Sequence, residues 1–321
     1  MGKAEVLALL REEEYVSGEE ISRALGVSRA AVWKAIDALR DDGCRIDSAP
    51  NRGYRLRVRA LSEELVRAAL GDCPWSVRVL DETDSTNNVL KRECTAPHGT
   101  VIITGKQTGG RGRLGRQFAS PRGGVYLSVL LRPNAAPEQL LHLTPMTAVA
   151  VRRAIFDCCG VSVDIKWTND LVAGGKKLTG ILTEMTTEAD SGMLQSVIPG
   201  IGVNCNTVLE ELPPEVQPMA TSLERLAGHP IDPNALAAAM VRRLYEMDAA
   251  LFSQREAWLR EYADACVTLG KRVQIVRGGE RREAFAEGID ENGSLRVRYP
   301  DGSTGVIAAG EVSVRGMYGY V

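Results

Sequence analysis

The sequence is poor in the residues that build the commonest metal and redox sites. Among its 321 residues there are three histidines, far apart at positions 98, 142 and 229. This scatter argues against a histidine metal site or a Ser-His-Asp triad. Seven cysteines occur at irregular spacing and form no C-x-x-C pair, which favours reduced thiols over a disulfide framework. We therefore predict no metal ligands among the side chains.

Long apolar runs and a strong net charge are also missing. No stretch approaches the roughly 20 apolar residues that a membrane-spanning helix needs. The first residues, MGKAEVLALLREEE, place acids directly after a short apolar patch, which is not the pattern of a signal peptide. We expect a cytoplasmic protein without a membrane partner. The net charge of −2 means that any nucleic-acid contact must come from local clustering of basic residues.

The first 60 residues are predicted to form a winged helix-turn-helix. Two helical stretches are joined through LGVS, and a serine cap precedes each of them, at Ser17 and Ser28. Two short alternating strands then flank a turn at 50–53. The helix spacing and the hairpin together are typical of a module whose second helix enters the major groove.

Basic residues gather in the second half of this module. Residues 28–59 contain eight basic and four acidic residues, whereas most acids lie in the first two helices. This segregation predicts DNA binding, with Ser28, Arg29, Lys34 and the wing-tip Arg52 as contacts. A helical protein-interaction module with a solvated charged face remains the alternative.

The rest of the chain divides into two parts. Residues 61–267 alternate strand-like and helical stretches, which predicts a mixed sheet in an α+β domain. Residues 268–321 carry turn signals at short intervals between alternating strands, which predicts a small β-barrel.

The stretch GKQTGGRGRLGRQFASPRGG, residues 105–124, is the most unusual in the chain. It holds seven glycines and five basic residues but no acid, so it buries too little apolar surface to fold by itself. It is compatible with a solvated loop, a nucleic-acid contact or a phosphate cradle in which backbone N–H groups and arginines converge. It is not a Walker loop, because no G-K-[ST] follows.

Three further stretches favour the cradle. DETDSTNN gathers neighbouring polar side chains before a helix, where a helix cap is the simpler interpretation. IKWTNDL and the following hairpin VAGGKKLTGIL place Asp170 at a strand end and Lys177 after a Gly-Gly turn, where an exposed lysine is the simpler interpretation. In IPGIGVNCN, strand alternation puts Gly200, Gly202 and Asn204 on one face, which either admits a flat ligand or marks tight sheet packing.

In this order, STNN, GRGRLGR, KWTNDL, KKLTGIL and GIGVN resemble biotin–protein ligases, and the winged helix matches the bifunctional kind that also represses the biotin operon. The resemblance covers nearly the whole chain. It implies an α+β protein with a winged helix-turn-helix, a central ligase domain with a mixed sheet, and a C-terminal SH3-like barrel. It also implies synthesis of biotinyl-5'-adenylate from biotin and ATP with Mg²⁺, and transfer of biotin to a lysine of the biotin carboxyl carrier protein.

The resemblance assigns roles residue by residue. The implied catalytic residues are Lys177, Arg111, Arg113 and Asp170. The implied biotin contacts are Ser85, Thr86, Asn87, Gln107, Arg111, Gly112, Arg113 and Lys177. The implied nucleotide contacts are Arg113, Arg116, Phe118, Lys177, Asn204 and Arg315. Phe118 stands where the family often has a tryptophan over adenine, and we expect it to take that role.

The resemblance further implies regulation by the product of the first reaction. The adenylate-loaded protein is expected to form a homodimer that binds operator DNA, or else to meet its carrier. Two alternatives stay open: a ligase whose winged helix serves protein contacts, and a ligand-responsive transcription factor without ligase activity. A lipoate ligase shares the chemistry, but the winged helix, GRGRLGR and the C-terminal barrel together disfavour it.

Overall fold

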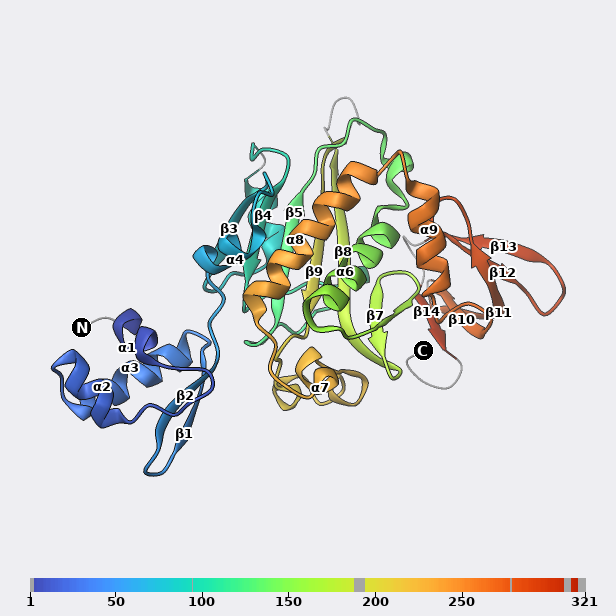
Figure 1. Cartoon of the computed structure of the whole chain (residues 1–321). Coiled ribbons are helices and arrows are strands. Elements are labelled where there is room, and N and C mark those ends of the chain that lie inside the picture. The colour runs from blue at the N-terminus through green and yellow to red at the C-terminus, as the bar shows by residue number, and fades with distance from the viewer. Residues whose placement is uncertain (1–2, 94, 188–193, 278, 309–312, 317–321) are drawn as a thin grey trace.

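The computed structural model places three parts in a row, with the N-terminal helices at one end and a small sheet at the other (Figure 1). It describes residues 3–93, 95–187, 194–277, 279–308 and 313–316. The bounds that we predicted for the three domains, 1–60, 61–267 and 268–321, stay predictions.

The N-terminal part has the element order of a winged helix-turn-helix. Its elements are α1 (Lys3–Leu9), α2 (Gly18–Leu25), α3 (Arg29–Asp41), β1 (Arg45–Ala49) and β2 (Gly53–Val58). Both predicted caps form, since Ser17 Oγ accepts from Glu20 N at 3.0 Å and Ser28 Oγ accepts from Ala31 N at 3.2 Å. Apolar side chains such as Ile21 and Ile36 form a separate core here, so the unit buries its own apolar faces.

The central part is built on a seven-stranded mixed sheet, as predicted. Its strand order is β3-β4-β5-β9-β8-β7-β6. Only the β3–β4 pair is parallel; the other neighbours are antiparallel. The strands are β3 (Ser76–Leu80), β4 (Thr100–Thr104), β5 (Val125–Leu130), β6 (Asp164–Lys166), β7 (Asp170–Ala173), β8 (Lys176–Thr187) and β9 (Leu194–Val203).

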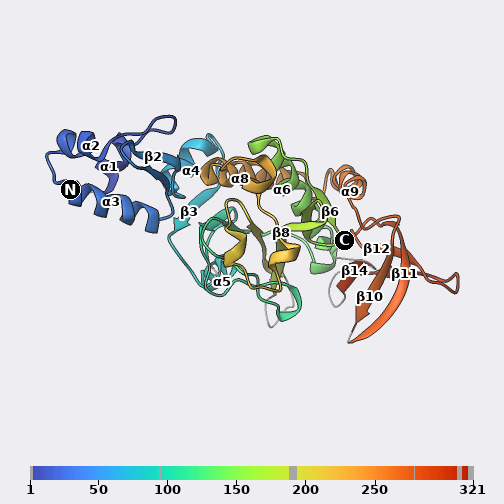
Figure 2. The ribbon, with the colours of Figure 1, turned by 90° about the horizontal axis from the view of Figure 1, so that it is seen from below.

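Helices cover this sheet unequally (Figure 2). One face carries α4 (Glu63–Leu70), α6 (Leu143–Cys159) and α8 (Pro233–Ala250), whereas the short α5 (Thr86–Arg92) packs on β4, β5 and β9 from the other face. Alternate strand residues follow this division: Val101 and Ile103 join the large core, and Ile102 joins a small core with α5. The face that carries α5 therefore keeps room for a ligand.

Shorter elements complete the central part. These are the 3₁₀ turns η1 (Arg113–Gly115), η2 (Pro137–Leu140), η3 (Leu209–Glu211) and η4 (Gln217–Met219), and the helices α7 (Leu223–Ala227) and α9 (Arg255–Asp264).

The C-terminal part is a five-stranded antiparallel sheet of order β13-β12-β11-β10-β14. Its strands are β10 (Arg272–Arg277), β11 (Glu280–Ile289), β12 (Leu295–Arg298), β13 (Thr304–Ile307) and β14 (Ser313–Gly316). In the described residues β13 and β14 are the two ends of the sheet, so closure into an SH3-like barrel is not confirmed. The apolar core of the central part continues into this sheet through Val273 and Ile275, and Trp167 Nε1 donates to Gly293 O at 3.0 Å.

Two global expectations can be compared with the described residues. Within these ranges, no helix combines the length and the apolar character required to cross a bilayer. The cysteines at 44, 73, 158, 159, 205 and 266 are free thiols. Burial raises the pKa of the Cys158 thiol to about 12, which keeps it protonated and unreactive at neutral pH.

Candidate functional site

A cavity of about 600 Å³ opens between the Gly/Arg stretch, the start of α5 and the strands β7, β8 and β9. A volume of this size is typical of a small-molecule site. Most of the predicted site residues line it. These are Ser85, Thr86, Asn87, Gln107, Arg111, Gly112, Arg113, Arg116, Phe118, Asp170 and Lys177.

The Gly/Arg stretch has more backbone structure than its composition suggests. It folds back on itself as a narrow loop, in which Gln107 N donates to Ser120 O at 3.0 Å and Phe118 N donates to Gly110 O at 3.0 Å. A Cβ atom on Gly110 would lie 2.3 Å from the Phe118 carbonyl oxygen, so this close approach requires glycine. The loop thus directs its arginines without an apolar core of its own.

One end of the cavity is cationic. Lys177 Nζ lies 2.6 Å from Asp170 Oδ1, and Arg113 Nη1 donates to Asn169 Oδ1 at 3.2 Å. Burial lowers the pKa of Arg113, an effect that the charge of Asp170 partly offsets. A guanidinium is still charged at neutral pH. The partly desolvated positive charges at this end of the cavity therefore favour an anionic ligand.

The floor of the cavity is flat because β8 and β9 carry glycine there. A Cβ atom on Gly202 would lie 2.4 Å from the Phe118 ring, and one on Gly180 would lie 2.9 Å from it. Phe118 also packs edge-on against Tyr126, with ring centroids 6.4 Å apart. Lys177 Nζ lies 5.7 Å from the Phe118 centroid. The predicted lid residue therefore rests on the glycine floor, beside the cationic cluster.

Around the start of α5 the cavity is lined by polar, uncharged side chains. Ser85 occupies the N-cap position of α5, yet its side chain makes no capping hydrogen bond. Gln107 Oε1 accepts from Thr86 N at 2.9 Å, and Asn87 Nδ2 donates to Glu184 Oε2 at 2.8 Å. Donors and acceptors held in this way suit a ligand that is polar but uncharged at this end.

Two predicted nucleotide contacts stand apart from this set. Asn204 does not line the cavity: it is buried, and its Nδ2 donates to Thr221 O at 3.1 Å. Arg315 lies in β14, where its backbone is paired with Gln274, itself a residue of the cavity wall. The side chain of Arg315 lies outside the part of the chain that the structure describes. Their roles stay predictions.

Sequence reasoning missed several residues that the fold brings to the site. Met219, 41% exposed, and Gln274 line the cavity from segments without a recognisable motif. Glu184 contacts Asn87 although 97 residues separate them. In the sequence, Glu184 lies two residues beyond the VAGGKKLTGIL stretch, and only this proximity relates it to the site.

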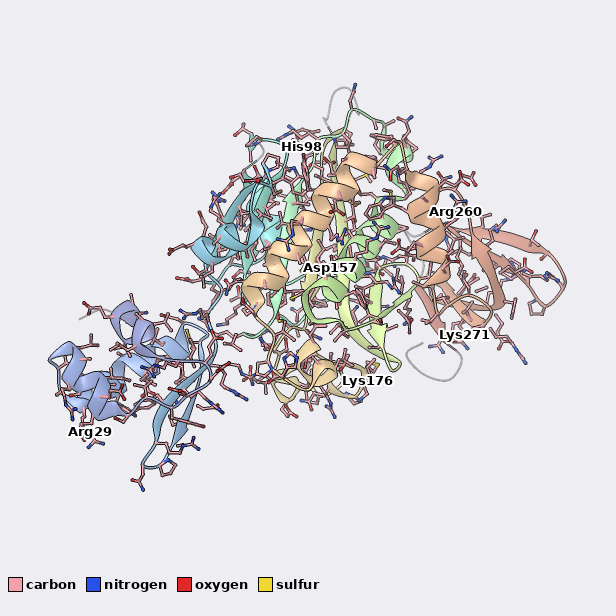
Figure 3. All side chains as sticks on the ribbon, in the orientation of Figure 1. Arg29, His98, Asp157, Lys176, Arg260 and Lys271 are labelled. Carbon is pink, nitrogen blue, oxygen red and sulfur yellow. The ribbon has the colours of Figure 1, made fainter. Side chains whose placement is uncertain are left out.

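The N-terminal module presents its predicted DNA contacts to the outside. Ser28, Arg29, Lys34 and Arg52 are all exposed, and Figure 3 shows Arg29 at the outer end of this module. Arg52 lies over the Tyr15 ring, 4.4 Å from its centroid. Together, fold and cavity define a protein with a ligand cavity lined in part by cationic side chains and a separate helix-turn-helix surface.

Comparison with known proteins identifies the family to which the chain belongs. Residues 79–204 match the biotin/lipoate A/B protein ligase family, residues 3–55 an HTH domain, and residues 268–315 the biotin protein ligase C-terminal domain. The chain is similar to the bifunctional ligase/repressor BirA of Escherichia coli, 32% identical over 97% of this chain and 96% of that protein. It also resembles the BirA of Bacillus subtilis, 42% identical over 68% of this chain and 69% of that one.

A solved structure agrees with these matches. The biotin protein ligase of Aquifex aeolicus, in complex with biotin and ATP, superposes with a TM-score of 0.65 at 28% identity, over 75% of this chain and 99% of that one. The chain therefore belongs to the biotin protein ligase family, and its N-terminal domain places it among the bifunctional ligase/repressors.

Proposed function

We propose that this protein is a biotin–protein ligase that activates biotin with ATP as biotinyl-5'-adenylate. It then transfers biotin to a lysine of the biotin carboxyl carrier protein of acetyl-CoA carboxylase. The observation that carries the proposal is the composition of one cavity, which has a neutral polar end, a glycine floor and a cationic end. Biotin has a matching division, with an uncharged ureido ring at one end and a carboxylate at the other.

The difficulty of the first step explains the cationic end. A carboxylate must attack the α-phosphate of ATP, and two such anions about 4 Å apart repel each other by roughly 4 kcal/mol at an effective dielectric constant near 20. Lys177, Arg111 and Arg113 line the cavity where they can offset this repulsion and stabilise the charge of the transition state. Arg116 extends the same charge toward the outgoing phosphates.

Mg²⁺ is part of the proposal as a companion of ATP. Among the described lining residues Asp170 is the single carboxylate, and it is paired with Lys177. Nowhere in the described ranges do three or more metal-ligating side chains gather. A protein cage for the ion does not fit this site, whereas an ion held mainly by phosphate oxygens does.

The remaining contacts follow the shape of the cavity. We place the ureido ring against Ser85, Thr86, Asn87 and Gln107. The adenine lies near Phe118 and the glycine floor, with Asn204 and Arg315 as outer contacts of the nucleotide. Asp170 has two candidate roles, to help deprotonate the carrier lysine or to orient neighbouring groups, and its 2.6 Å contact with Lys177 supports the second.

Incubation with biotin, ATP, Mg²⁺ and a biotin carboxyl carrier domain tests the proposed reaction. We expect the carrier mass to rise by one biotinyl group. We also expect pyrophosphate to be released from ATP when biotin is present, even without the carrier domain. If neither pyrophosphate release nor carrier labelling occurred, ligase activity would be rejected, and a ligand-responsive transcription factor would remain as the alternative.

The helix-turn-helix surface adds the second activity. We propose that the adenylate-loaded protein forms a homodimer in the cytoplasm and binds operator DNA upstream of biotin-synthesis genes, with biotinyl-5'-adenylate as corepressor. The exposed basic residues at the start of α3 and on the wing support this.

We expect operator affinity to rise when biotin and ATP are added, and Arg29→Ala to lower it by about 5- to 100-fold, because a base or phosphate contact is lost. Gel shifts with a fragment of a biotin-synthesis promoter measure both effects. Arg260→Ala is the matched control, since Arg260 is also exposed but lies on α9 at the far side of the molecule (Figure 3). Binding that ignores biotin and ATP would contradict the coupling and favour a protein-contact role.

We expect Phe118→Ala to release biotinyl-5'-adenylate about ten-fold faster, because an aromatic wall over the glycine floor is lost. Stopped-flow dissociation of the adenylate measures the rate. Phe156→Ala is the control, because Phe156 is 56% exposed on α6 and does not line the cavity. An unchanged rate in the Phe118 variant would remove this residue from the nucleotide site.

A further inference from the structure

A chain of hydrogen bonds runs behind the polar end of the cavity, and its origin is a carboxylate that no motif contains. Glu184 on β8 accepts from Asn87 Nδ2 at 2.8 Å and from Lys91 Nζ at 2.5 Å. Burial by itself raises the pKa of Glu184, but the hydrogen bonds from Lys91 and Asn87, with the charges of Lys91 and Arg111, bring it below the ordinary value. The carboxylate is therefore ionised at neutral pH and can only accept hydrogen bonds.

This charge determines which way the Asn87 amide is turned. Because Glu184 accepts only, the NH₂ group of Asn87 must face it, and the carbonyl oxygen Oδ1 must face the other way. There Ser128 Oγ lies 2.5 Å from Asn87 Oδ1. A carbonyl oxygen has no proton to donate, so the Ser128 hydroxyl must be the donor in this hydrogen bond, and it has no second proton to donate elsewhere.

The hydroxyl of Thr86, which lines the cavity, is constrained by the same hydrogen bonds. Thr86 Oγ1 lies 2.6 Å from Ser128 Oγ, and the serine proton is already used. Thr86 must therefore donate in this short contact, in preference to the 3.3 Å contact with Gln107 Oε1. Gln107 Oε1 is meanwhile satisfied by the backbone N–H of Thr86 at 2.9 Å. The threonine oxygen keeps only lone pairs for a ligand.

We propose that Glu184 is a positioning residue that fixes the direction of every hydrogen bond from Asn87 through Ser128 to Thr86. Thr86 Oγ1 thereby becomes an acceptor that selects a ligand with a ring N–H donor, such as a cyclic urea. This inference rests on the proposed biotin site, and it adds the residue that orients the hydrogen-bond acceptor for the ureido N–H. Glu184 itself contacts no substrate.

Glu184→Gln separates this role from simple packing, because the amide has the same shape but can also donate. The Asn87 amide is then free to turn over, and the whole chain can reverse. We expect the KM for biotin to rise about ten-fold, while the KM for ATP and kcat stay near the wild-type values. We also expect weaker discrimination against the cyclic carbonate analogue of biotin, in which oxygen replaces both ureido N–H groups.

Two companion variants make the test decisive. Lys91→Arg changes the ion pair that ties α5 to β8 but keeps a positive charge beside Glu184, and so keeps the ionised carboxylate facing Asn87; it should leave the preference for biotin over the carbonate intact. Ser128→Ala breaks the chain in its middle and should weaken that preference even if Glu184→Gln folds poorly. Thermal melting of each variant monitors folding.

The outcomes distinguish this inference from the proposed function. A wild-type protein without biotin adenylation would reject the function itself. An active wild type, with biotin and carbonate weakened equally in the Glu184→Gln and Ser128→Ala variants, would reduce Glu184 to a structural residue. An unchanged KM for biotin and an unchanged preference in both variants would overturn the inference as well.

Discussion

Replacing Lys177 with methionine is expected to slow formation of biotinyl-5'-adenylate by about two to three orders of magnitude, the loss typical of removing one preorganised electrostatic contact to a transition state. Methionine keeps an apolar stem of similar length, so the floor beside Phe118 stays filled. What disappears is the positive charge between the reacting carboxylate and the α-phosphate. Pyrophosphate release in a single turnover, with saturating biotin and ATP, measures the step directly.

The environment of Lys177 demands a second variant. Removing the ammonium group leaves Asp170, whose Oδ1 lies 2.6 Å from it, as an additional negative charge beside two anionic substrates. That charge by itself would repel them. In the double variant Lys177→Met/Asp170→Asn this repulsion is gone, so its deficit relative to the single variant Asp170→Asn reports the missing lysine charge.

The neighbouring lysine provides a matched control. Lys176 is half-buried at the hairpin between β7 and β8 and does not line the cavity (Figure 3). Lys176→Met removes the same charge from the same turn and should leave the rate of pyrophosphate release unchanged. Full activity of the Lys177 variant, or equal losses in both variants, would refute the assignment of Lys177 to the reacting centre.

The parts of the fold that sequence predicts are those that local chemistry determines. Ser17 and Ser28 cap helices because their side chains bond to a backbone N–H three residues further on, and this pattern is visible in the sequence. The Gly174–Gly175 turn joins β7 to β8 for the same local reason, since both glycines adopt positive φ. Motifs in the Gly/Arg loop and on the hairpin likewise identified residues that now line one cavity.

The remaining features depend on strand register and on loops that meet only after folding. Composition predicted no structure for the 105–124 stretch, because its stability comes from backbone hydrogen bonds such as Phe118 N to Gly110 O. The predicted glycine face of β9 exists, yet Asn204 at its end turns to a backbone carbonyl, away from the cavity. Glu184 meets Asn87 only because β8 and β9 pair beneath α5. No local pattern encodes such a contact.

Among the glycines that line the cavity, Gly200 is the one where an added Cβ atom would come closest to a neighbouring residue. A Cβ atom there would lie 2.1 Å from Asn87 Oδ1 and 2.8 Å from Asn87 Cγ. The Gly200 backbone is paired with Ser128 on one side and Leu182 on the other, so the strand cannot easily retreat. In Gly200→Ala the Asn87 side chain must therefore leave both Ser128 and Glu184.

We accordingly expect Gly200→Ala to raise the KM for biotin by about 10- to 100-fold, since the turned amide loses a charge-assisted hydrogen bond and a neutral one. The KM for ATP should change little, because the floor beneath Phe118 is made by Gly202 and Gly180. Steady-state kinetics with each substrate varied in turn measure the two constants. Gly105→Ala is the control, since a Cβ atom there would meet nothing within 4 Å. If the Gly200 variant bound biotin normally, the ureido ring would lie elsewhere, and the polar end of the cavity would lose its assigned ligand.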